Sequence, residues 1–243
     1  MAEHTKEAGH WYDREGNPRY TIIGKNGKER NTTLRDARKE GLLPSVTSII
    51  RCAAAPGLEN WKAQQVLMAA LTTDRLPEET EQQFIDRIIK DSQEQAMKAR
   101  ERGTLIHAWV QSGFEGKPLG HEANIFYDNA RIRIEQECGD LPWICEQAFS
   151  TGRYGGKIDL QNATHIIDIK TTDKDLTDVK TWHEHHMQLA AYCRNNGQRC
   201  GILYINYHAE TKLIWITDEE KDTGWQCFNA LLDYYYAKTG LGG

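Results

Sequence analysis

Two adjacent apolar runs, each interrupted by one carboxylate, constrain this chain more than any other feature. The first is Tyr154–Leu160, which contains Asp159, and the second is His165–Thr172, which contains Asp168. The short stretch around Asn162 is typical of a turn, so the two runs are predicted to be neighbouring β-strands of a hairpin. Burying both carboxylates among Ile and Leu side chains is costly unless positive charge lies between them. A divalent cation is the simplest candidate for that charge.

Strand alternation adds a lysine to this predicted site. Residues two apart in a strand share a face, so Asp168 and Lys170 are predicted to project to one side of the sheet. The apolar side chains of Ile167 and Ile169 then project to the other side. One face of the hairpin is therefore predicted to hold an anion and a cation together.

This pattern resembles that of the PD-(D/E)xK nuclease superfamily, in which an Asp and a spacer precede Asp-x-Lys. Gly156–Asp159 followed by Ile167–Thr171 is similar to the RecB-like exonuclease branch, which includes phage-type and mitochondrial genome maintenance exonucleases. Further marks of that branch are Gly103–His107 upstream and Gln188–Tyr192 downstream of the hairpin. Pro44–Thr47 also recurs in phage and mitochondrial members, although ordinary helix capping explains that segment as well.

The resemblance implies an α/β (α+β) fold with a restriction-endonuclease-like αβββαβ core and an N-terminal helical extension. Predicted helical segments are 34–39, 44–50, 58–71, 78–90, 92–102, 104–114, 122–137, 182–195 and 219–238, and predicted strands are 19–23, 29–33, 143–149, 154–160, 165–172, 199–207 and 213–217. Their order agrees with that core. We expect one nuclease domain, 1–243, with a ribbon and helical subdomain at 1–102 and the catalytic core at 103–243.

The resemblance also implies roles for the residues of the site. Asp159, Asp168 and His107 are expected to bind one or two Mg²⁺ or Mn²⁺ ions, with the carbonyl of Ile169 as a further ligand. A histidine ligand favours Mn²⁺ over Mg²⁺. Lys170 is expected to orient the attacking water and to offset negative charge at the phosphate.

Three more residues are expected to support catalysis. Relatives often carry a Glu on the strand before the hairpin, as at Glu146, although a solvent-facing Glu on an edge strand is an equally good interpretation. Gln188 and Tyr192 are four residues apart on a predicted helix, so they share a face that can point at the site. The alternative is structural: Tyr192 packs in the core and Gln188 satisfies a buried backbone group.

The histidine-rich stretch His183–His186 resembles a metal cluster only superficially. A zincin helix needs His-Glu-x-x-His, and the required last position is Met187. Three near-consecutive imidazoles cannot share one face of a helix. We therefore expect these histidines to be exposed.

Net charge indicates little about nucleic acid here, because the formal value is −5. Local basic residues are more informative. Lys98, Arg100 and Arg102 stand just before the His107 helix and are predicted to form one wall of a DNA channel, holding phosphates without reading bases. Ordinary solvated surface charge is the alternative for each of them. The expected partner is DNA, bound independently of sequence and through a free end, and a recombination or repair protein is a further candidate partner.

Six cysteines without a Cys-x-x-Cys pair are expected to be reduced, buried thiols. Some RecB-like relatives hold an iron–sulfur cluster with one early and three late cysteines. The late cysteines here, Cys193, Cys200 and Cys227, are too widely spaced for that motif, so no cluster is expected. The start, Met1–Lys6, lacks the apolar core of a secretory signal, and no apolar run approaches the roughly 18 residues of a membrane span. A cytoplasmic location without membrane contact is expected, in a bacterial host if the chain is phage-encoded.

The expected function is that of a metal-dependent DNA exonuclease that leaves 5′-phosphate ends, in recombination, repair or replication. One alternative is a structure-specific endonuclease that acts on branched or flapped DNA. Another is a non-catalytic DNA-binding or recombination-partner protein with a decayed nuclease core. The intact set of Asp159, Asp168 and Lys170 argues against decay, because nothing structural requires all three. The motif of a serine hydrolase, Gly-x-Ser-x-Gly, is absent from the sequence.

Overall fold

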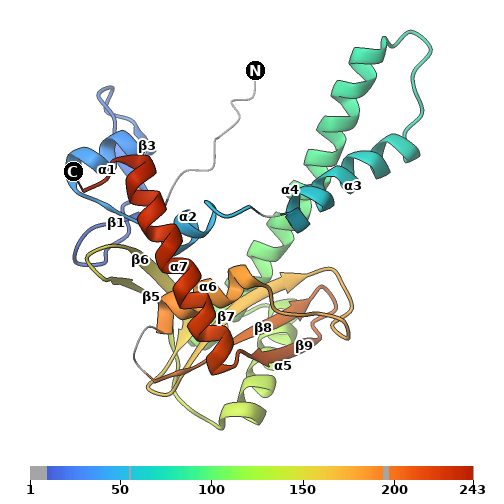
Figure 1. Ribbon diagram of the computed structural model, residues 1–243. Helices are drawn as coiled ribbons and strands as arrows, with labels where there is room; N and C mark the ends of the chain where they lie inside the picture. Colours follow the sequence, from blue (N-terminus) through green and yellow to red (C-terminus); the bar gives the residue numbers. More distant parts are fainter. Residues whose placement is uncertain (1–9, 55, 194–196, 243) are drawn as a thin grey trace.

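The computed structural model describes residues 10–54, 56–193 and 197–242, and its centre is a five-stranded mixed β-sheet (Figure 1). The strands are β5 (Ile144–Ser150), β6 (Gly155–Gln161), β7 (His165–Thr172), β8 (Arg199–Asn206) and β9 (Thr211–Trp215). They are hydrogen-bonded in that order. The β7–β8 pair is parallel, and the other neighbouring pairs are antiparallel. The predicted hairpin is thus confirmed as β6–β7, and the chain has a mixed α/β fold.

Helices cover both faces of this sheet (Figure 1). On one face lie α2 (Val46–Ile50), α6 (His183–Cys193) and α7 (Asp218–Thr239), and on the other lie α4 (Glu81–Phe114) and α5 (His121–Cys138). Ile166 packs in the first core, whereas Ile167 and Ile169 pack in the second, which confirms the alternation predicted for β7. Each such fully buried Ile stabilises the fold by about 1.5–3 kcal/mol.

The N-terminal segment forms the predicted ribbon and also reaches the central sheet. Strands β2 (Thr21–Ile23) and β3 (Glu29–Asn31) pair antiparallel. Two further short strands, β1 (Trp11–Tyr12) and β4 (Leu43–Pro44), pair with each other, and α1 (Leu34–Glu40) lies between β3 and β4 along the chain. Ser45 then forms a bridge with Gly155 at the start of β6, and Val46 and Ile49 enter the core that contains Tyr154. The N-terminal segment thus packs against and stabilises the strand that carries Asp159.

One long helix, α4, replaces three predicted helices. The segments 78–90, 92–102 and 104–114 form a continuous helix of 34 residues that begins with a capping box between Thr80 and Gln83. No proline interrupts it, and its Gly103 fits a close approach to β7, because a Cβ there would lie 2.5 Å from Thr171 Oγ1. The predicted division between 102 and 103 therefore falls inside a helix.

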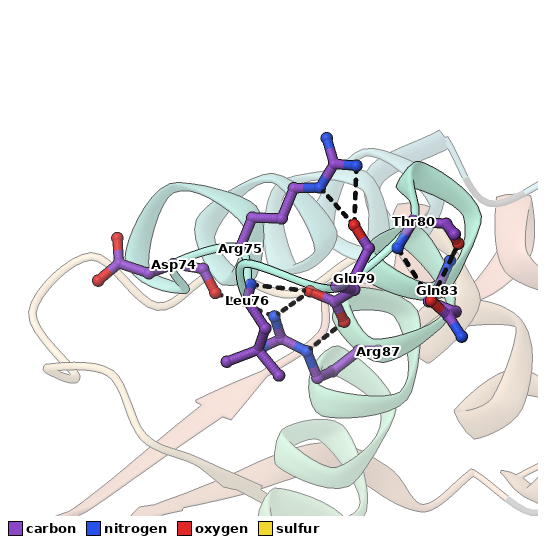
Figure 2. A network of polar contacts seen from close by, with 7 residues as sticks. All are labelled: Asp74, Arg75, Leu76, Glu79, Thr80, Gln83 and Arg87. Atoms are coloured by element: carbon purple, nitrogen blue, oxygen red, sulfur yellow. Dashed lines mark hydrogen bonds and ion pairs between the residues drawn. The ribbon is translucent and has the colours of Figure 1, made fainter.

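An arm made of α3 (Pro56–Thr72) and the first half of α4 projects from the body of the molecule (Figure 1). A polar network closes its tip (Figure 2): Arg87 forms an ion pair with Glu79 at 2.7 Å and donates to the carbonyl of Asp74 at 2.9 Å. The Leu76 N–H donates to the same Glu79 carboxylate at 3.2 Å. Hydrogen bonding from Arg87 lowers the pKa of Glu79 to about 2. These contacts fix the loop that joins the two helices.

Cysteine pairing differs from the prediction. Cys193 at the end of α6 and Cys200 in β8 form a disulfide, so the expectation of six thiols is wrong for this pair. Among the described residues, four cysteines are free: Cys52, Cys138, Cys145 and Cys227. No helix in the described ranges is both long and apolar enough to cross a membrane. Residues 1–9, which bear on the leader prediction, and residue 195, the predicted end of the α6 segment, lie outside the described residues.

Candidate metal centre

Three side chains from three elements converge at one edge of β6. They are His107 from α4, Glu146 from β5 and Asp159 from β6, and one ligand atom of each lies within 4.8 Å of the others. His107 Nε2 is 3.2 Å from Asp159 Oδ2. Imidazole nitrogen with carboxylate oxygen is a donor set that suits divalent first-row metals. This trio, which we call the metal trio, can therefore hold a divalent ion.

The backbone is distorted where the metal trio lies. Glu146 adopts a left-handed conformation, with φ of 51°, inside a strand. It lies opposite Asp159, since Cys145 pairs with Leu160 and Gln147 pairs with Ile158. A non-glycine residue held in this region costs about 1–3 kcal/mol and persists only where its surroundings enforce it. Such distortions are typical of functional sites and re-aim side chains.

The alternation of side chains along β6 is also broken next to the metal trio. Ile158 packs in the core beside α6, whereas Leu160, two residues later, packs in the core beside α4. The intervening Asp159 points at His107 on the α4 side and accepts the Ile169 backbone N–H at 2.8 Å. A regular strand cannot bring these three orientations together.

Strands β6 and β7 separate next to the metal trio. Their backbone pairing comprises Leu160–Ile167 and Gln161–Ile166, and the Asp159 carboxylate then takes the Ile169 N–H that a neighbouring strand would otherwise accept. The N–H and C=O of one residue point to the same edge of a strand. The Ile169 carbonyl therefore also faces the opening, which is the position expected for a backbone metal ligand.

Asp168 lies beside the metal trio in a separate polar network. Its side chain is 3 % exposed. Gln188 Nε2 donates to Asp168 Oδ1 at 2.7 Å, and Lys170 Nζ lies 2.8 Å from Asp168 Oδ2. Gln188 Nε2 also donates to Tyr192 Oη at 2.9 Å, so Gln188 and Tyr192 do share a face toward the site. Glu146 thus occupies the place in the metal trio that the sequence analysis gave to Asp168.

Each carboxylate of the site has a basic side chain beside it. Lys170 pairs with Asp168, Lys157 pairs with Glu146, and His107 contacts Asp159. The sequence analysis expected a metal to supply positive charge here, and in the structure Lys157 and Lys170 also lie beside these carboxylates. A metal at the trio must therefore compete with these protein cations.

These pairings set the proton affinities of the site. Burial raises the pKa of the Asp159 carboxyl, but the hydrogen bond and charge of His107, with the charge of Lys170, more than offset it, so the pKa is lowered. Burial lowers the pKa of His107, but the hydrogen bond with Asp159 and the charges of Asp159, Glu146 and Asp168 together outweigh it, so that pKa is raised. Burial raises the pKa of Asp168 to about 6, although the charge of Lys170 opposes the change.

A cavity of about 1150 Å³ opens from the metal trio toward the α3–α4 arm. It is lined by all three residues of the trio and by Trp61, Lys62, Arg100, Gln111, Lys157, Ile169, Lys170 and Tyr207, among others. The sequence analysis assigned no role in the site to several of these residues. Lys157 had a signal, because it stands two residues before Asp159 in the Gly-Lys-Ile-Asp motif. Trp61, Lys62 and Tyr207 are brought to the cavity only by tertiary packing.

The three basic residues of the predicted wall lie in different places relative to the cavity. Arg100 lines the cavity and lies on the same face of α4 as His107, seven residues or two helical turns away. Lys98 and Arg102 are not among the lining residues. Arg102 instead donates to Glu122 at 2.7 Å and lies over the Trp109 ring, 5.3 Å from its centroid. Arg102 is therefore part of the α4–α5 contact.

The histidine-rich start of α6 is not uniformly exposed. His186 is buried, with its Nε2 2.8 Å from Thr181 Oγ1, so the expectation of exposure is wrong for this residue. His185 is half-buried, and its Nδ1 lies 3.1 Å from Tyr204 Oη. His183 is exposed, as expected. The side chains of His185 and His186 thus connect the start of α6 to Tyr204 and Thr181.

Comparisons with known proteins leave the family open. No family model matches the chain, and no curated protein matches it. Among solved structures, the one described as "Crystal structure of SSO0001" is similar to this chain with 14 % sequence identity and a TM-score of 0.31, covering 72 % of this chain and 86 % of the other. A TM-score this low does not establish a shared fold, so neither fold nor function is inferred from it.

Proposed function

We propose that this chain is a divalent-metal-dependent deoxyribonuclease of the PD-(D/E)xK type, in the RecB-like branch. The observation that carries the proposal is the convergence of His107, Glu146 and Asp159 beside Lys170, at the point where β6 and β7 separate. The order of helices α4 and α5, three antiparallel strands, helix α6 and a parallel strand supports it, because apart from the additional helix that order agrees with an αβββαβ core.

The donor set suits Mg²⁺ or Mn²⁺, which would supply positive charge to the scissile phosphate and to the attacking and leaving oxygens. His107, Glu146 and Asp159 would hold one ion, with the Ile169 carbonyl as a further ligand. Within the described residues, a second ion has no comparable set of His, Cys, Asp and Glu ligands of its own.

Lys170 acts in this proposal as a fixed cation. Burial lowers the pKa of its amine, but the charges of Asp168 and Asp159 more than offset it, so the pKa is raised. Asp168 and Gln188 hold the ammonium group at 2.8 Å and 3.2 Å, and Lys170 lines the cavity. A protonated Lys170 orients a water and offsets negative charge on the phosphate by donating hydrogen bonds.

DNA is the proposed substrate, because the cavity combines cations with partly exposed aromatic side chains. Lys62, Arg100 and Lys157 can bind phosphates, and the rings of Trp61 and Tyr207 offer surfaces on which bases can stack. The α3–α4 arm borders the cavity on one side, which favours a chain end over a continuous duplex. An exonuclease that serves DNA recombination, repair or replication is therefore the proposed function.

Incubation with linear and circular DNA in the presence of Mn²⁺ tests this proposal. Degradation of linear DNA alone is the expected result, and a chelator should abolish it. Nicking of the circle would instead indicate an endonuclease. DNA binding without cleavage of any form would indicate a non-catalytic binding protein. The matched control is Asp159→Asn, which preserves the size of the side chain and removes the charge that holds the metal.

A further inference from the structure

The ion pair between Lys157 and Glu146 occupies the metal trio itself. Lys157 Nζ contacts Glu146 Oε2, and both residues line the cavity with Asp159. The Glu146 side chain is 14 % exposed, whereas that of Lys157 is 39 % exposed. The lysine therefore reaches the carboxylate from the solvent-filled side, where a metal and a substrate would also arrive.

Lys157 is paired with a residue of the metal trio and cannot itself bind a metal, and both properties together distinguish it from Lys170 and His107. Lys170 is bound to Asp168 and Gln188, neither of which belongs to the metal trio. His107 contacts Asp159 but is a metal ligand in its own right. Lys157 has no lone pair with which to bind a metal, and its positive charge repels a divalent ion that approaches the Glu146 carboxylate.

The flexible stem of Lys157 makes such an exchange feasible. A lysine carries its charge on a four-carbon chain with free rotation, and the ammonium can move several ångströms while the strand stays in place. Lys62, Arg100 and Lys170 also line this cavity. Their positive charges favour the binding of an anion close enough for the Lys157 ammonium to reach it after it leaves Glu146. Phosphates of a nucleic-acid strand are anions of this kind.

We propose that Lys157 is an exchangeable counter-ion that couples metal binding to substrate binding. Without metal, its ammonium neutralises Glu146. When a divalent ion binds the metal trio, Lys157 leaves Glu146 and binds a backbone phosphate of the strand in the cavity. This inference rests on the proposed function. By reciprocity, metal and DNA each bind more tightly when the other is present.

Calorimetric titration with Mn²⁺ alone, without DNA, provides the first test. Lys157→Gln removes the competing cation, so its dissociation constant for Mn²⁺ should fall at least about 5-fold relative to the parent. Lys157→Arg retains a cation beside Glu146 and should resemble the parent. A Lys157→Gln variant that binds Mn²⁺ with the parent's affinity, or more weakly, would overturn the proposal.

The second test measures DNA binding against salt concentration, with a short oligonucleotide that carries phosphorothioate linkages. With Mn²⁺, Lys157→Gln should lose one phosphate contact, and its log–log salt slope should fall by about 0.7–0.9. With a chelator, parent and variant should show equal slopes, because Lys157 is then engaged with Glu146. An equal loss of slope under both conditions would show that Lys157 is a permanent phosphate contact and would contradict the exchange.

Lys62 offers a matched control, because it lines the same cavity and forms its own ion pair with Glu59 at 2.8 Å. Lys62→Gln should leave Mn²⁺ affinity unchanged and lower the DNA salt slope equally with and without metal. If the parent itself binds neither Mn²⁺ nor DNA, the proposed function fails. If the parent binds both and only the Lys157 differences are missing, the counter-ion proposal alone fails. Should Lys157→Gln melt below the parent, Lys157→Met, which keeps the apolar stem, replaces it.

Discussion

Gln188 lies between Asp168 and Tyr192 and donates to both, to Asp168 Oδ1 at 2.7 Å and to Tyr192 Oη at 2.9 Å. Its carbonyl oxygen accepts from Lys170 Nζ at 3.2 Å. One amide side chain on α6 therefore orients both the buried carboxylate of β7 and the lysine proposed to face the phosphate. All the polar atoms of that amide are used within the protein, so its effect on DNA cleavage is exerted through Asp168 and Lys170.

Replacing Gln188 by alanine should destabilise the protein as well as impair cleavage. The change leaves Asp168 Oδ1 and the Tyr192 hydroxyl without this buried partner, which costs about 1–3 kcal/mol in the free energy of unfolding. Tyr192→Phe is the matched control and should lose only about 1 kcal/mol, because it removes one hydrogen bond. Urea denaturation measures both. Equal stability of Gln188→Ala and the parent would contradict this network.

Asp168→Ala should be strongly destabilising, because it leaves the charge of Lys170 unpaired. Breaking a buried pair costs about 3–5 kcal/mol, and we expect the lower end, since the Lys170 side chain keeps 32 % exposure. The double variant Asp168→Ala with Lys170→Met removes both charges and should recover much of the loss. Both variants should be inactive. Chemical denaturation separates the two effects: a double variant no more stable than the single one would contradict the pairing.

His107→Ala should weaken metal binding, because one of three ligands is lost. Even outer-shell changes cost about 10–100-fold in metal affinity, so a reduction of at least about 10-fold is expected for an inner ligand. Titration calorimetry with Mn²⁺ measures it. His165→Ala is a suitable control, because the His165 ring lies tilted against that of Trp215 and does not line the cavity. Unchanged affinity in His107→Ala would remove this residue from the metal trio.

Two arginines two positions apart on α4 should differ in their effect on DNA. Arg100→Ala should weaken DNA binding and lower the log–log salt slope by about 0.7–0.9, because Arg100 lines the cavity. Arg102→Ala should leave both quantities unchanged and cost at most about 1 kcal/mol of stability through its partly exposed pair with Glu122. Fluorescence anisotropy at several salt concentrations tests this. Equal losses in the two variants would restore the full predicted wall.

Acid should destabilise the protein partly through His185. Burial, helped by the charge of Lys170, lowers the pKa of His185 from 6.5 to about 4. The unfolded chain then binds more protons than the folded protein between these values, so this contribution to stability is full above pH 6.5 and is lost as pH falls toward 4. The loss is on the order of 2–3 kcal/mol.

His185→Gln removes that titration and provides the comparison. Between pH 7 and pH 4 its free energy of unfolding should fall by less than that of the parent, by about the same 2–3 kcal/mol. Protonation would also remove a local contact, because His185 Nδ1 accepts the Trp182 backbone N–H at 3.3 Å and a protonated nitrogen cannot accept it. Parallel pH profiles for parent and variant would show that His185 titrates normally.

The sequence by itself determined the features that depend on local periodicity. Alternating residues place Ile167 and Ile169 opposite Asp168 and Lys170, and the structure confirms this because the pleat of a strand has a period of two. Spacing of four on a helix likewise brought Gln188 and Tyr192 to one face. The β2–β3 ribbon forms where strands were predicted at 19–23 and 29–33.

Only the tertiary structure decided how these local pieces combine into a site. Glu146 has a left-handed backbone conformation, β6 separates from β7, and Asp159 departs from the regular alternation and points toward His107. Helical rotation of a single continuous α4 then sends Arg100 into the cavity and leaves Arg102 to pack against α5. Distances between side chains on different elements depend on how those elements pack, and a local periodicity carries no information about that packing.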